Sequence, residues 1–213
     1  MRLNCDETIQ GIIVQMPLPG HLSQKMVADL ISSSKDIDGI SPRNAGNLFL
    51  SLPSFLPATV AAVMEILDRV QAQLEGKRAV IISRSNIVGK PLAMMLLQKN
   101  ATVTVSHSHT VDLAGFTRQA DVLVAAAGHA NMITADMVRP GAIVIDVGIN
   151  ELPGGGIVGD VDFIPVSEVA GAITPTPGGV GPLTNILLLK QCVQAAWQQV
   201  HDRERMLGEV SLS

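Results

Sequence analysis

The stretch between residues 80 and 110 constrains the fold more than any other part of the chain. A first apolar run, Ala79-Val80-Ile81-Ile82, breaks at Ser83 and leads through a polar turn into a segment rich in Leu and Met. A second run, residues 101–105, is rich in β-branched residues and ends in Ser106-His107-Ser108-His109-Thr110. Strand, turn, helix and strand within about thirty residues is the rhythm of one βαβ unit. Such a unit commonly places a ligand phosphate at the turn, because free backbone N–H groups and the helix dipole favour negative charge there.

Further strands follow this unit. Residues 121–127 (DVLVAAA) and 142–147 (AIVIDV) are short apolar runs that end at Gly128 and Gly148, and a short helical piece over 134–138 separates them. Strands that alternate with helices predict an α/β fold with a mainly parallel sheet and helices on both faces.

The N-terminal segments carry weaker patterns. Residues 11–15 (GIIVQ) read as a buried strand that must turn at the following PLP, because proline cannot continue a strand ladder. Ser23 suits the N-cap of a helix that runs to about Ser33. Residues 40–57 lack periodicity and contain three prolines, so we expect a long loop there.

Helical patterns frame the rest of the chain. Apolar residues recur at threes and fours from Thr59, which predicts a helix over 59–75 with Gly76 as its C-cap. A glycine-lined loop over 174–182 precedes the last predicted helix, 183–200, and the tail from residue 201 carries no motif.

Composition excludes several classes of function. The chain is 47% hydrophobic and 16% charged, which favours a folded core over disorder. Its net charge of −4, without basic clusters, argues against a nucleic-acid partner, and no apolar run is long enough to span a membrane. Cys5 and Cys192 form no metal or redox spacing, so we expect a reducing, cytosol-like compartment.

The turn after the first strand is not the usual dinucleotide fingerprint, because only Gly89 survives in SRSNIVG. Taken alone, this turn fits an ordinary βα connection as well as a cofactor site. NAD sites usually carry an acid after the second strand, whereas His107 and Ser108 stand here without a carboxylate that would repel a phosphate. Arg84 adds a cation suited to a phosphate. If a dinucleotide binds, these residues favour NADP over NAD.

Other candidate chemistry is weakly supported. His107 and His109 also fit the role of solvated strand-end residues, and we expect His129 at the surface. No spacing of His, Cys or carboxylates indicates a metal site, and no G-x-S-x-G motif supports a hydrolase triad. Asp36 and Asp38 fit either capping and turn formation or the binding of a polar heterocycle.

Seven motifs follow one another along the chain: GIIVQMPLP, KDIDG, SRSNIVGKP, TVTVSHSHT, GAIVIDVGIN, GDVDF and TPTPGGVGP. With them the chain resembles the bifunctional methylenetetrahydrofolate dehydrogenase/methenyltetrahydrofolate cyclohydrolase family, from about Leu3 to about Val200. The resemblance implies oxidation of 5,10-methylenetetrahydrofolate by NADP and hydrolysis of the product to 10-formyltetrahydrofolate, within one-carbon metabolism and purine biosynthesis.

The resemblance also implies two domains. A Rossmann-like NADP-binding domain is expected over 59–181 with the linking helix 59–75. A truncated α/β folate domain is expected over 1–58, completed by the helix 182–200, with a tail over 201–213. We further expect a cytoplasmic homodimer without membrane or nucleic-acid partners, a mitochondrial form being an alternative.

Site residues follow from matching the motifs one by one. Gln15 is implied in the folate pocket and in assisting a catalytic lysine, and Asp38 in holding the pterin ring, so both are catalytic candidates. The folate pocket is implied at Gln15, Pro17, Leu18, Asp38, Pro177, Gly178, Gly179 and Gly181. The NADP site is implied at Ser83, Arg84, Ser85, Val88, His107, Ser108, Gly128, Gly148, Ile149 and Asn150. No metal is implied.

The sequence departs from the family pattern at the catalytic lysine. That lysine lies in an S-x-x-Y-x-x-x-K helix upstream of the GIIVQ segment, whereas this chain has no tyrosine and its six lysines lie outside such a motif. We therefore expect the first roughly 70 to 80 residues of the folate domain to be missing. The usual P-C-T-P is Pro57-Ala58-Thr59-Val60, and Ser83 replaces the first glycine of the G-R-S turn.

Three interpretations remain open. In the first, the chain is a truncated sequence or isoform of an active folate enzyme. In the second, it is a non-catalytic relative that binds NADP or a partner protein without turnover. A plain NAD-dependent dehydrogenase of another family is the third, and it would need an acid after the second strand.

Overall fold

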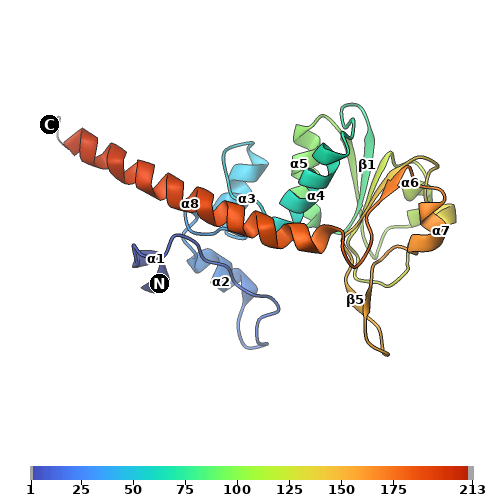
Figure 1. Ribbon diagram of the computed structural model, residues 1–213, viewed down its shortest axis with the longest axis horizontal. Coiled ribbons are helices and arrows are strands. Elements are labelled where there is room, and N and C mark those ends of the chain that lie inside the picture. The colour runs from blue at the N-terminus through green and yellow to red at the C-terminus, as the bar shows by residue number, and fades with distance from the viewer. Residues whose placement is uncertain (1, 211–213) are drawn as a thin grey trace. The chain divides into compact units, whose positions relative to one another are not determined.

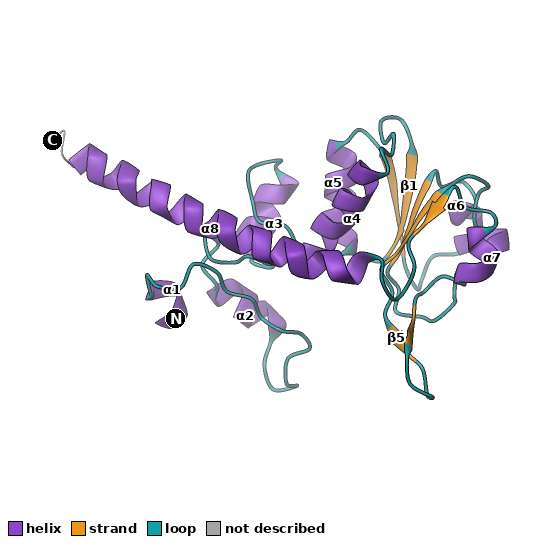
Figure 2. Ribbon diagram, in the orientation of Figure 1, coloured by secondary structure: helices purple, strands orange, loops and turns teal. Residues whose placement is uncertain are grey.

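The computed structural model describes residues 2–210, and the chain divides into two compact units (Figures 1 and 2). One unit, which we call the sheet unit, comprises Thr59–Thr184. The other, the helical unit, comprises the residues up to Ala58 together with those from Asn185 onward. Within the described range every strand belongs to the sheet unit, as the colouring in Figure 2 shows.

A five-stranded sheet in the order β2-β1-β3-β4-β7 forms the centre of the sheet unit, and every neighbouring pair is parallel. Ile82 at the end of β1 lies opposite Ser106 of β2 and Ala125 of β3, and Ala125 lies opposite Asp146 of β4. The chain therefore leaves these four strands at one common edge. The predicted α/β fold with a mainly parallel sheet is confirmed. The strands are β1 (Arg78–Ile82), β2 (Thr102–Ser106), β3 (Val122–Ala125), β4 (Ile143–Asp146) and β7 (Ala172–Ile173).

Helices lie on both sides of this sheet, with α4 and α5 on one side and α6 and α7 on the other (Figure 1). Both faces of the central strands are buried, and Val80, Leu123 and Val144 belong to one apolar cluster with exposures of at most 3%. The remaining elements of the unit are α4 (Ala58–Arg69), α5 (Gly89–Gln98), α6 (Leu113–Thr117), the 3-10 helix η1 (Ala135–Met137), the antiparallel pair β5 (Asn150–Glu151) and β6 (Ile157–Val158), and α7 (Phe163–Ser167).

The helix predicted over 59–75 ends six residues early. α4 stops at Arg69, and Gln71 takes a left-handed conformation with φ +53°. Leu74 nevertheless remains buried. The apolar periodicity continues past the end of the helix because Leu74 packs in the core, although it does not belong to a helical turn. Gly76 is not the C-cap: it lies in the turn before β1 with φ +72° and donates its N–H to the Asn100 carbonyl.

The helical unit contains short helices and the greater part of a long one. Its small core consists of Ile37, Phe55 and Ala195, with Cys192 packed against them. The elements are α1 (Arg2–Cys5), α2 (Gln24–Leu30), α3 (Pro42–Phe49) and α8 (Val180–Val210), which begins in the sheet unit. No helix in the described range is both long and apolar enough to cross a membrane.

The strand predicted over 11–15 is wrong. Ile12 forms a single parallel bridge with Asp36, and Ile13 is 51% exposed. An extended segment becomes a stable strand only when neighbouring strands satisfy its backbone groups on a hydrophobic sheet face. A single bridge does not provide that, so an apolar run with the composition of a strand stays irregular.

Three helices also differ from the predictions. The loop predicted over 40–57 contains α3, where the Ser41 hydroxyl accepts the Asn44 N–H and Pro42 takes the first turn. Both are standard helix-start signals, and the prolines masked them. Ser23 does cap α2, but that helix ends at Leu30. α8 extends the predicted helix at both ends and includes most of the predicted tail, whose residues 211–213 lie outside the described part.

Candidate functional site

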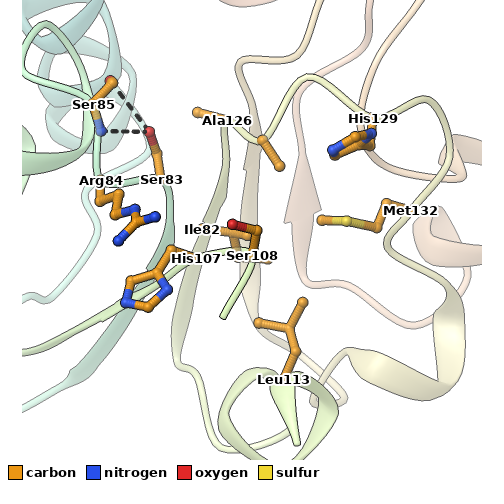
Figure 3. A pocket seen from close by; sticks show the side chains of 11 residues that line it. Ile82, Ser83, Arg84, Ser85, His107, Ser108, Leu113, Ala126, His129 and Met132 are labelled. Carbon is orange, nitrogen blue, oxygen red and sulfur yellow. Dashed lines mark hydrogen bonds between the residues drawn. The ribbon is translucent and has the colours of Figure 1, made fainter. Parts of the chain in front are cut away.

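A cavity of about 440 Å³ opens at the edge where the chain leaves β1, β2 and β3, and we call it the first cavity. Figure 3 shows Arg84 and His107 on one side of it, and His129 and Met132 on the other. The chain order reverses between β1 and β3, and open α/β sheets bind ligands at such a switch point. The cavity is lined by Ile82, Ser83, Arg84, Ser85, His107, Ser108, Leu113, Ala126, Ala127, His129 and Met132.

The first cavity has a basic wall and no carboxylate among its lining residues. Arg84 and Ser108 are exposed, and His107 is half-buried at the end of β2. The His107 Nδ1 accepts the backbone N–H of His109 at 3.2 Å, so a neutral ring carries its proton on Nε2. A guanidinium, an imidazole N–H and a hydroxyl together suit a phosphate group.

The turn from β1 into α5 is tighter than the sequence suggests. The Ser85 hydroxyl accepts the N–H groups of Val88 and Gly89, and its carbonyl accepts the N–H of Lys90. A side chain at Gly89 would put Cβ 2.1 Å from the Ser83 carbonyl oxygen, so the one surviving glycine lets helix and turn approach. The first amides of α5 are therefore already bonded, and anion binding here depends on side chains.

A second cavity of about 280 Å³ lies at the same edge, beyond β4 and β7. Gly148 and Ile149 after β4 face the loop that contains Pro177, Gly178 and Gly179. The lining residues are Thr59, Asp146, Val147, Gly148, Ile149, Ile157, Pro175, Thr176, Pro177, Gly178, Gly179, Val180, Gly181, Pro182 and Thr184.

Two buried carboxylates, Asp146 and Asp160, organise this edge, and neither was predicted as a site residue. Asp146 Oδ1 accepts the N–H groups of Gly148 and Asp160, and its Oδ2 accepts the N–H of Val161. Burial raises the pKa of Asp146 above its ordinary value, although these hydrogen bonds oppose the shift. The signal was present in the motifs GAIVIDVGIN and GDVDF, but it was used only for the resemblance.

In the helical unit the two aspartates of KDIDG have different roles. Asp36 is fully buried and accepts the N–H groups of Ile40 and Ser41 and the side-chain amide of Asn44, so it forms the turn and start of α3. Asp38 is only partly buried, and its Oδ1 accepts the N–H of Ala58 at the start of α4. Burial raises the pKa of Asp38, and the nearby Asp36 charge adds to that.

The remaining predicted folate residues of the helical unit lie on an irregular segment. Gln15 and Pro17 are exposed, and Leu18 is half-buried. None of them belongs to a helix or strand, because the predicted strand over 11–15 does not form.

The structure thus brings the predicted site residues into separate groups. Ser83, Arg84, Ser85, His107 and Ser108 meet at the first cavity. Gly148, Ile149, Pro177, Gly178, Gly179 and Gly181 meet at the second. Three predicted cofactor residues line neither cavity: Val88, Gly128 and Asn150.

Sequence reasoning also missed part of the first cavity. Leu113, Ala126, Ala127 and Met132 carry no motif, and His129, although exposed as expected, lines the cavity. The described residues contain no cluster of three or more His, Cys, Asp or Glu arranged to hold a metal ion.

Two family models match the chain. The model of the tetrahydrofolate dehydrogenase/cyclohydrolase NAD(P)-binding domain matches residues 57–200, and the model of the catalytic domain of the same family matches residues 1–38. The chain belongs to this family. The resemblance inferred from the seven motifs is confirmed.

Relatives within the family are similar over most of this chain. The bifunctional protein FolD of Variovorax paradoxus is 55% identical over 194 residues, which cover 91% of the chain and 69% of the relative. That of Listeria innocua is 53% identical over 194 residues, covering 91% and 68%. The chain thus spans about two thirds of the length of these relatives.

Solved structures agree. The bifunctional FolD enzyme of Campylobacter jejuni superposes with a TM-score of 0.91 at 51% identity, over 93% of this chain and 71% of that one. The Trypanosoma brucei FolD enzyme, solved with NADP cofactor and an inhibitor, gives a TM-score of 0.89 at 39% identity, over 93% and 70%.

Proposed function

We propose that the chain binds NADP at the first cavity and oxidises 5,10-methylenetetrahydrofolate to 5,10-methenyltetrahydrofolate, which is then hydrolysed to 10-formyltetrahydrofolate. The observation that carries this proposal is the first cavity itself, in which Arg84, His107 and Ser108 converge without a carboxylate inside a matched NAD(P)-binding domain. Relatives of the chain are named bifunctional FolD proteins, and the Trypanosoma brucei FolD structure was solved with NADP cofactor.

The residues of the first cavity fit the cofactor. The Arg84 guanidinium, the His107 Nε2 proton and the Ser108 hydroxyl supply donors for the 2′-phosphate that distinguishes NADP from NAD. Ser83 and Ser85 shape the turn beneath them through the hydrogen bond between their hydroxyls. Gly148 and Ile149 in the second cavity are proposed to border the nicotinamide. Bound NADP supplies the hydride acceptor of the reaction.

Folate contacts are proposed for residues of each unit. Asp38 keeps Oδ1 on the start of α4, which leaves Oδ2 for the donor groups of the pterin ring. Gln15, Pro17 and Leu18 are proposed as further folate contacts of the helical unit, and Pro177, Gly178, Gly179 and Gly181 as folate contacts of the sheet unit. In these terms the helical unit is a partial folate domain and the sheet unit is the cofactor domain.

The experiment is a paired assay on the chain as it exists. Calorimetry measures the binding of NADP and of NAD, and absorbance at the reduced-nicotinamide band follows methylenetetrahydrofolate-dependent reduction of NADP. We expect NADP to bind more tightly than NAD, and reduction to depend on the folate. NADP binding no tighter than NAD binding would contradict the cofactor assignment.

A second candidate function is supported by one observation. The chain contains no tyrosine, and its six lysines lie outside the S-x-x-Y-x-x-x-K motif that the family resemblance assigns to catalysis. This second candidate is a relative that binds NADP or a partner protein without turnover. Tight NADP binding without folate-dependent reduction would favour it over the enzymatic function.

We also propose that the protein is a cytoplasmic homodimer and that its product serves purine biosynthesis. Support for self-association comes from the exposed apolar side chains of α8 in the helical unit, including Leu189 and Trp197. Light scattering coupled to size-exclusion chromatography tests this proposal, and a monomer mass at micromolar concentration would contradict it.

A further inference from the structure

Asp160 is the most completely enclosed carboxylate of the edge that carries both cavities. Its exposure is 0%, and four N–H donors surround it. Oδ2 accepts the backbone N–H groups of Ala127 and Gly128 at 2.5 and 3.0 Å. Oδ1 accepts the backbone N–H of His129 and the side-chain amide of Asn150, both at 2.9 Å. Every partner is a donor, so both oxygens of the side chain act as hydrogen-bond acceptors.

The donors come from two separate loops. Residues 127–129 follow β3, and Ala127 and His129 line the first cavity. Asn150 begins β5 directly after Gly148 and Ile149, which line the second cavity. Asp160 therefore ties the wall of one cavity to the wall of the other, although it lines neither.

The surrounding packing holds this tie in one place. A Cβ at Gly148 would lie 2.3 Å from Asp160 Oδ1, so the loop after β4 rests directly against the carboxylate. The backbone N–H of Asp160 is itself held by Asp146, whose own N–H donates to the Thr174 hydroxyl at the start of the loop over the second cavity. A displaced Asp160 side chain would leave up to four donors without their acceptor, which is costly in a buried position.

We propose that Asp160 is a positioning residue that fixes the spacing between the first and second cavities, so that a ligand spanning both is bound with its two halves in register. The inference rests on the proposed function, in which that ligand is the whole NADP molecule. A fragment confined to the first cavity does not depend on this spacing. Asp160 thus acts through the loops and touches no ligand.

The test uses the variant Asp160→Asn and compares its binding of a whole ligand with its binding of a fragment. The asparagine side chain replaces one acceptor oxygen with an NH2 donor, whereas all the partners of Asp160 are themselves donors. Calorimetry with NADP probes both cavities, and calorimetry with adenosine 2′,5′-bisphosphate probes the first cavity alone. We expect the affinity for NADP to fall about tenfold and that for the bisphosphate to change by less than about threefold. Hydrogen exchange should be faster at amides 127–129. Asp162→Asn, two residues away at the start of α7 and without a capping hydrogen bond, is the matched charge control and should change none of these values.

The outcomes separate the hypotheses. An equal loss for both probes would show that Asp160 only builds the first cavity, and unchanged NADP binding would show that the spacing does not matter. Either result overturns the inference. Wild-type chain that binds neither probe would sink the proposed function itself. Should Asp160→Asn fail to fold, Asn150→Ala removes one donor of the four and lines neither cavity, and it should give the same pattern with about a threefold loss for NADP.

Discussion

The two units of this chain differ in how completely they bury their apolar side chains and pair their backbone groups. In the sheet unit, Ile81, Leu123 and Val144 are 0% exposed, and parallel pairing satisfies the central strands on both edges. In the helical unit, one apolar cluster contains only Ile37, Phe55 and Ala195 as buried side chains, and α2 contains no buried residue at all. A stripe of exposed apolar residues follows α8: Ile186, Leu189, Val193, Trp197 and Val200.

This difference indicates which ligand-binding site is formed within a single unit. A parallel sheet with helices on both faces completes its hydrogen bonds and its core within one continuous stretch, so the residues at its carboxyl edge are held rigidly. The first cavity belongs wholly to that stretch. The helical unit contributes no residue to the lining of the first cavity. Cofactor binding should therefore tolerate changes in the helical unit.

The largest expected effect concerns core packing. Leu123→Ala on β3 removes a fully buried side chain and should lower the free energy of unfolding by about 3 kcal/mol. Met26→Ala on α2, where the side chain is 66% exposed, should change it by less than about 0.5 kcal/mol. Urea titrations followed by circular dichroism measure both values. Similar costs for the two variants would break the contrast between the units.

The next effect concerns the cofactor. Arg84→Ala removes a charged donor from the first cavity and should weaken NADP binding by about 10- to 100-fold, because hydrogen bonds to charged groups contribute about 1.5–3 kcal/mol. NAD lacks the extra phosphate, so its affinity should change by less than about threefold. Calorimetry with the two cofactors decides, and an equal loss would show that Arg84 does not recognise that phosphate.

The third prediction applies the reciprocal change to the helical unit. Asp38→Asn keeps an acceptor for the Ala58 N–H but removes the charge, so folate affinity should fall about tenfold while NADP affinity stays the same. Calorimetry with a folate analogue and with NADP gives both numbers. A parallel loss of NADP affinity would mean that the cofactor site is not confined to the sheet unit.

The smallest effect is a pH dependence. Because burial raises the pKa of Asp38, the folded state holds this proton to higher pH than the unfolded state. Wild-type stability relative to Asp38→Asn should therefore decrease as pH rises from about 3.8 through the raised pKa, and level off above it. Asp136 on η1, whose pKa is lowered mainly by its hydrogen bond from Thr134, should give the opposite slope in Asp136→Asn. Urea titrations at several pH values measure both, and slopes of the same sign would contradict the assignment.

Local sequence patterns predicted the elements that depend on interactions between residues close in sequence. The strands after Lys77, the N-cap at Ser23 and the family motifs were readable because side-chain periodicity and capping act over a few residues. The helix α3 could also have been predicted, because Ser41 and Pro42 are helix-start residues. The surrounding prolines instead favoured the prediction of a loop. The strand expected over 11–15 failed because a strand depends on neighbours that its own sequence cannot supply.

The sequence by itself determined the α/β class and the family, and it predicted Arg84, His107 and Ser108 as a phosphate-binding set. Only the tertiary structure decided that Ser85 occupies the first amides of α5, that Asp36 supports a turn while Asp38 keeps one oxygen available, and that Asp160 joins two loops. The reason is physical: a motif specifies which groups are present, whereas hydrogen-bond partners distant in sequence are chosen when the strands align and their ends meet at one edge.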